Sequence, residues 1–152
     1  MGMCPTLARY LQISGQMSLA MNRSLLFLAS LLLVLGLRAQ DPTRDKVVLA
    51  MKTGNAKELA EQFIANIDLT VKETSEVYSK AQAEQIIRKF FNDHPPVDMV
   101  IEHSGVSKFG DKYYIGILRT RNGYFRVTFF LKKTGELMQV KQLRIEASKN
   151  DL

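Results

Sequence analysis

A small set of side chains in this 152-residue chain has the chemistry for general acid–base catalysis. Such catalysis needs a carboxylate base and a tyrosine or a protonated acid that face the same cavity. The residues of suitable type are Tyr78, Asp98, Glu102, His103, Tyr113 and Tyr114. No motif links their spacing to a catalytic arrangement, and tyrosines in strands commonly belong to a core or an interface with a solvated hydroxyl. We therefore predict no catalytic residue, and take Tyr78, His103 and Tyr114 as candidates for contacting a ligand.

The chain offers few ligands for a metal ion. Its histidines are His94 and His103, and no cluster of His, Asp and Glu has the spacing of a metal site. Its single cysteine, Cys4, precedes the export signal described next. We predict no metal and no cofactor, and in the exported part no disulfide and no thiol nucleophile.

A secretory signal is the clearest functional pattern in the chain. A short basic region at Met21-Asn22-Arg23 precedes an unbroken apolar run from Ser24 to Leu37, and the small residue Ala39 follows. This order is typical of a signal peptide, and the apolar run is short for a bilayer span. The sequence predicts translation from Met21 and cleavage near Ala39/Gln40. Residues 1–40 are then a signal segment and 41–152 a single domain, exported to the periplasm or the extracellular space, with no stable membrane span after cleavage.

The mature domain carries only a modest charge. The whole chain has 21 Lys and Arg against 15 Asp and Glu, a net charge of +6. All the acids follow position 40, whereas Arg9, Arg23 and Arg38 precede it, which leaves 18 bases against 15 acids, a net charge of +3. Basic and aromatic residues do interleave as on a nucleic-acid platform, at Arg119, Tyr124, Arg126 and Phe130. Export and the small net charge argue against that function, and we predict no nucleic-acid partner.

Three helices are expected in the first half of the mature domain. Asp41-Pro42 starts the first helix and Gly54 ends it, while Asn55 starts the second. A capping box from Ser79 to Gln82 opens the longest helix, which Pro95-Pro96 ends. The apolar stripe of this helix consists of Ala83, Ile86, Ile87, Phe90 and Phe91.

Five strands are expected around these helices. Alternation from Ile67 to Val71 predicts one strand before the long helix. The other four follow the helix and pair antiparallel over Val97–Lys108, Lys112–Arg121, Tyr124–Lys133 and Leu137–Glu146. Asn122-Gly123 is the favoured type I′ pair, and as a two-residue loop it would place Thr120 opposite Phe125 and Leu118 opposite Val127.

The hairpins divide the sheet into two faces. One face is almost wholly apolar and should meet the long helix, although Leu143 and Ile145 have the right parity only if a bulge lies near Lys141-Gln142. The other face has an apolar centre with basic edges. Such a face resembles an interface with a polar rim, so we expect it to pair two copies of the chain. The predicted interface residues are Ile115, Ile117, Arg119, Arg126 and Phe130.

Several segments resemble a known family. They are Val77–Ala83, Tyr114–Leu118, Asn122–Val127, Leu131–Lys133 and Gln142–Glu146. They are similar to a family of small exported proteins of undefined function from Gram-negative bacteria, within the nuclear transport factor 2-like superfamily, over about residues 43–147. The resemblance implies an α+β, cone-shaped, cystatin-like fold, in which a helical pair and one long helix pack on a strongly curved antiparallel sheet. It leaves activity open, because the superfamily holds isomerases, dehydratases and non-enzymatic modules.

Three functions remain open from the sequence. The leading hypothesis is an exported non-enzymatic module that binds a small apolar or amphipathic ligand, or a protein partner. The second is a small cofactor-free enzyme, an isomerase, dehydratase or hydrolase, that uses a carboxylate and a tyrosine in the cone. The third is a structural component of the envelope. A cavity that held a carboxylate with a raised pKa beside a tyrosine or histidine would favour the enzyme.

Overall fold

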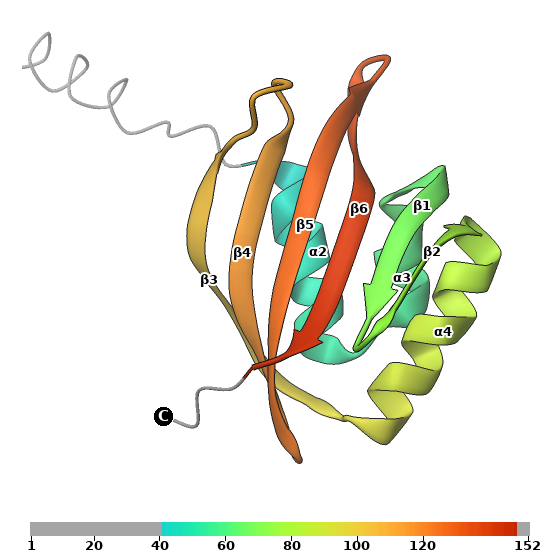
Figure 1. Cartoon of the computed structure of the whole chain (residues 1–152), viewed down its shortest axis with the longest axis vertical. Helices are drawn as coiled ribbons and strands as arrows, with labels where there is room; N and C mark the ends of the chain where they lie inside the picture. The colour runs from blue at the N-terminus through green and yellow to red at the C-terminus, as the bar shows by residue number, and fades with distance from the viewer. Residues whose placement is uncertain (1–40, 149–152) are drawn as a thin grey trace, which may run out of the picture. The chain divides into compact units, whose positions relative to one another are not determined.

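The computed structural model describes residues 41–148, which form one curved six-stranded sheet with helices against one face (Figure 1). The strand order is β2-β1-β6-β5-β4-β3. In chain order the elements are α2 (Pro42–Thr53), α3 (Ala56–Glu61), β1 (Phe63–Val71), β2 (Thr74–Ser79), α4 (Lys80–Asp93), β3 (Pro96–Val106), β4 (Lys112–Thr120), β5 (Gly123–Thr134) and β6 (Leu137–Ala147). The predicted signal segment, with its start at Met21 and its cleavage point, lies outside the described residues.

The helix starts follow the predicted caps. Asp41 accepts a hydrogen bond from the Thr43 amide of α2 at 3.2 Å, and Gly54 ends that helix with φ of 67°. Asn55 accepts from the Glu58 amide of α3 at 3.2 Å. At α4 both halves of the Ser79 capping box are formed.

The packed face of α4 is the predicted one. Ala83, Ile87, Phe90 and Phe91 are buried, and Ile86 packs partly against the same core. Phe90 meets Phe125 of β5 edge to face, with ring centroids 4.9 Å apart. The long helix therefore joins the sheet through its apolar stripe, as the 3.6-residue period requires.

The sheet has six strands, one more than the five predicted. The four C-terminal strands pair antiparallel in chain order, and β1 lies parallel to β6. The additional strand is β2, which forms a hairpin with β1. Its burial is slight and its residues show no apolar alternation, so the period that identifies a half-buried strand is missing there.

The loop predicted at Asn122-Gly123 is shifted by one residue, and that part of the prediction is wrong. Thr120 pairs with Gly123 and Leu118 with Phe125, so the two loop residues are Arg121 and Asn122. A type I′ turn needs positive φ at both central residues, and among the described residues Lys72 is the one non-glycine with positive φ. Contacts with the last residue of α4 and with the link that follows it explain the difference. The Asn122 side chain donates to the Asp93 carbonyl at 2.9 Å, and the Arg121 amide donates to the Pro95 carbonyl at 3.0 Å.

The bulge predicted in the last strand is confirmed. Phe130 pairs with Gln142 while its neighbour Leu131 pairs with Val140, which leaves Lys141 as the extra residue of β6. Val140, Leu143 and Ile145 are all fully buried. In the β4–β5 hairpin the observed pairing differs from the predicted one by two residues. Because two is an even number, each side chain stays on the face of the sheet predicted for it.

The space between helices and sheet is filled by side chains. Met51, Leu59 and Ile87 from the helices meet Leu118, Phe129 and Leu143 from the sheet, and all six are fully buried. No helix within residues 41–148 is long and apolar enough to cross a membrane.

Candidate functional site

The sheet face opposite the helices, called the open face below, carries all five predicted interface residues. Figure 1 looks onto this face, with α2 and α3 behind the sheet. Ile115, Ile117 and Phe130 are half-buried, while Arg119 and Arg126 are exposed. Because side chains alternate along strands, the parity read from the sequence placed these residues on one face.

Aromatic side chains extend the apolar centre toward β3. The Tyr113 and Phe130 rings are cross-strand neighbours with centroids 5.8 Å apart. The Tyr113 ring also lies over Gly105, where an added Cβ would come within 2.7 Å of the Tyr113 hydroxyl. A glycine at position 105 thus leaves room for the tyrosine to lie flat across the sheet.

Each arginine of the open face has a carboxylate opposite it on the neighbouring strand. Arg119 pairs in register with Asp98 of β3, and Arg126 with Glu146 of β6. A hydrogen bond from Lys52, 2.9 Å away, is the main cause that lowers the pKa of Asp98, and the charge of Arg119 adds to it. Glu146 forms an ion pair with Arg144 at 3.0 Å. The open face therefore mixes both signs of charge around its apolar centre.

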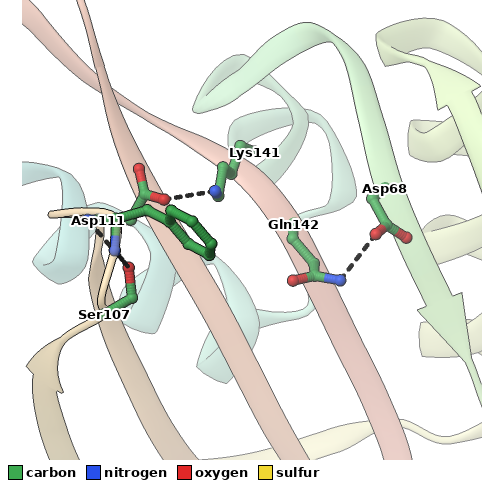
Figure 2. A network of polar contacts seen from close by, with 6 residues as sticks. Asp68, Ser107, Asp111, Lys141 and Gln142 are labelled. Carbon is green, nitrogen blue, oxygen red and sulfur yellow. Dashed lines mark hydrogen bonds and ion pairs between the residues drawn. The ribbon is translucent and has the colours of Figure 1, made fainter.

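Two polar contacts hold the curved sheet at its bulge (Figure 2). Lys141, the extra residue, forms an ion pair with Asp111 in the β3–β4 loop, and the Asp111 amide donates to the Ser107 hydroxyl at 3.2 Å. The next residue, Gln142, donates to the Asp68 carboxylate of β1 at 2.7 Å. The bulge in β6 thus links this strand to the β3–β4 loop on one side and to β1 on the other. Sequence reasoning located the bulge but not these partners, which lie 30 and 74 residues away.

Tyr114, a predicted ligand contact, belongs to the helix side of β4. Its ring stacks on Phe129 with centroids 5.1 Å apart. Burial raises its pKa, and the nearby Asp41 carboxylate raises it further. The same carboxylate accepts from Lys112 at 3.1 Å, and this hydrogen bond raises the pKa of Lys112. These contacts attach the start of α2 to β4, so a structural role accounts for the placement of Tyr114.

The structure does not bring the three predicted ligand contacts together. Tyr78 lies on β2 opposite Ile67 of the core face, whereas His103 is exposed on the far edge strand β3, opposite Ile115 of the open face. Partial burial raises the pKa of Tyr78, with a further contribution from Glu76. Among the described residues, no three His, Cys, Asp or Glu side chains are grouped so as to hold a metal ion.

Comparison with solved structures shows the class of the fold. A domain from Nostoc punctiforme described as having a cystatin-like fold is 10% identical, with 73% of this chain and 76% of that chain covered and a TM-score of 0.58. A putative calcium/calmodulin-dependent protein kinase II association domain from Xanthomonas campestris is 20% identical, with 69% and 82% covered and a TM-score of 0.52. Both likenesses concern the fold alone. The protein therefore has an α+β, cystatin-like fold.

Sequence similarity gives the family. The model of a domain of unknown function, DUF4783, matches residues 44–146. A DUF4783 protein from Bacteroides uniformis is 31% identical, with 70% of this chain and 97% of that chain covered and a TM-score of 0.65. A second, from Bacteroides ovatus, is 28% identical, with 69% and 94% covered and a TM-score of 0.64. The chain belongs to the DUF4783 family, and the resemblance seen in the sequence is confirmed. None of the curated proteins matches it.

Proposed function

We propose that this protein is an exported, non-enzymatic binding module that acts through its open face. The single observation that carries the proposal is the apolar centre of that face, formed by Ile115, Ile117 and Phe130, because the helices within residues 41–148 lie against the other face of the sheet (Figure 1). Apolar patches with a polar rim mark interaction sites on soluble proteins. The wide separation of Tyr78, His103 and Tyr114 supports binding over catalysis, because acid–base chemistry needs converging groups.

A second copy of the chain is the partner we propose for this face. In a two-fold pair the same patch meets itself, so uncompensated arginines would repel each other. Asp98 and Glu146 stand in register beside Arg119 and Arg126 and reduce that repulsion within each copy, although their ion pairs are with Lys52 and Arg144. The apolar centre can then be covered while the charged side chains stay at the rim.

Light scattering on the mature domain at tens of micromolar tests this pairing. We expect the mass of a dimer for the parent protein and of a monomer for Ile117→Asp, because a carboxylate at the centre of the interface would be buried without a partner. Leu49→Asp is the matched control, since Leu49 is 57% exposed on α2, behind the sheet. A parent protein that is monomeric at this concentration, and unchanged by Ile117→Asp, would rule out the dimer.

Export is the second part of the proposal, and it rests on the signal pattern between Met21 and Ala39. N-terminal sequencing of the protein recovered from fractionated cells should read from Gln40 or Asp41, in the fraction outside the cytoplasm. The cap at Asp41 supports this boundary, because its carboxylate is needed by both α2 and Lys112. Cytoplasmic protein with an intact Met1 or Met21 would contradict export.

A further inference from the structure

A groove of about 840 Å³ lies where the β1–β2 turn, the end of α4, the start of β5 and the end of β6 meet. Its volume is in the range of small-molecule sites. Val71, Phe125 and Ala147 give it apolar surface, and Glu73 and Glu146 give it carboxylates. Lys72, Thr74 and His94 complete the lining. None of the residues predicted from the sequence to contact a ligand, Tyr78, His103 and Tyr114, lines this groove.

His94 has an unmet hydrogen-bonding capacity beside this groove. It caps the C-terminus of α4, and its ring lies 5.1 Å from that of Phe90 and 4.8 Å from that of Phe125, centroid to centroid. Its Nδ1 atom is buried and has no hydrogen-bond partner within residues 41–148. Buried polar atoms in folded proteins almost always have a partner, so an unpaired one calls for an explanation such as a bound group.

The opposite wall of the groove is a strained turn. Val71 pairs with Thr74, so Lys72 and Glu73 form a two-residue turn in which Lys72 has φ of 58°. Glycine, asparagine or aspartate usually occupies such a position, and strained residues gather at functional sites. The Lys72 amide donates to the Ile145 carbonyl at 2.7 Å, which fixes the turn against β6.

We infer that this groove binds a small amphipathic amine, with its apolar body against Val71 and Phe125 and its ammonium group toward the carboxylates. The charges favour a cation. Arg144 and the in-register Arg126 both partly neutralise Glu146, so the attraction for a cation comes mainly from Glu73 and from the negative end of the α4 dipole at the same place. Glu73 forms no ion pair within the described part of the chain. Lys72 is the one lysine or arginine among the described lining residues. A rotation of the His94 ring about Cβ–Cγ would present Nδ1 as an acceptor to the ammonium group. The groove shares Glu146 with the rim of the open face, but its binding of an amine needs no second copy of the chain.

Three probes with eight-carbon chains test the inference: octylammonium, octan-1-ol and octanoate, each below the concentration at which it forms micelles or a separate phase. NMR chemical shifts of the His94 imidazole and of the amides of Glu73 and Glu146 report occupancy. We expect saturable shifts with octylammonium, binding on the order of tenfold weaker with octan-1-ol because the charge-assisted bond is lost, and none with octanoate. The inferred amine site would be overturned if octanoate bound as tightly as octylammonium, or if the shifts caused by octylammonium did not saturate.

Substitutions distinguish binding at a specific site from nonspecific hydrophobic binding to the protein surface. His94→Phe keeps the aromatic packing, removes the unpaired nitrogen and should leave Tm unchanged or higher, while affinity for octylammonium falls on the order of tenfold. Glu73→Gln should give a similar loss. Glu136→Gln, an exposed acid in the β5–β6 turn at the other end of these strands, should have no effect. Unaltered affinity in both His94→Phe and Glu73→Gln would show that the probe binds elsewhere. Because octylammonium binding and oligomeric state are measured separately, this inference and the proposed dimer can fail independently.

Discussion

Phe90→Ala should lower the free energy of unfolding by about 3–5 kcal/mol, the cost of removing a large buried aromatic side chain. Phe90 is 4% exposed and contacts the rings of Phe91, His94 and Phe125, so no single neighbour can move in to fill the cavity. A loss of that size is a large share of the stability of a domain this small. Chemical denaturation with a fitted midpoint and slope measures it.

Lys89→Ala is the matched control for this substitution. Lys89 is the preceding residue of α4 and is exposed, and alanine is at least as good a helix former, so the change should stay within about 0.5 kcal/mol. Similar midpoints for the two variants would mean that α4 packs through a different face. The comparison therefore tests the orientation of the helix as well as the energy of one contact.

The parts of the fold that depend on nearby residues were predictable. The caps at Asp41, Asn55 and Ser79 act within three residues, and the stripe of α4 repeats every three or four residues. The faces of β4 and β5 follow from strict alternation, which is why the interface residues of the open face could be placed. The bulge in β6 was predictable because Val140 and Leu143 could not otherwise both be buried.

The parts of the fold that depend on distant residues were not predictable from the sequence. The turn at Arg121-Asn122 is set by carbonyls at the end of α4 and in the link to β3, which no local pattern reveals. Strand β2 is held by backbone pairing with β1 and has no apolar period. For the candidate sites the same limit holds: the open face followed from parity, but the groove exists only because the β1–β2 turn meets the end of α4.

Gly116 is another residue whose importance only the packing reveals. It is buried in the middle of β4, opposite a stretch of β3 in which Ile101 pairs with Gly116 and His103 with Ile115, so that Glu102 is an extra, bulged residue. A Cβ at position 116 would lie 2.3 Å from the Val100 carbonyl oxygen and 3.1 Å from the Ile101 Cα. Both are backbone atoms, so no side-chain rotation can relieve the overlap, and the bend of β3 across β4 requires glycine here.

Gly116→Ala should therefore destabilise the domain by about 3 kcal/mol, the upper end of the range for overpacking, because β3 must shift as a whole. Hydrogen exchange should show where the cost falls. Protection should be lost along the β3–β4 ladder, while β5 and β6, paired with each other on the far side of β4, keep theirs. Ser104→Ala, an exposed change on β3, is the control and should alter stability by less than about 0.5 kcal/mol. If Gly116→Ala unfolds at the same denaturant concentration as the parent protein and keeps full protection in β3, the close approach of the two strands does not exist in solution, and the curvature of the sheet does not depend on glycine at position 116.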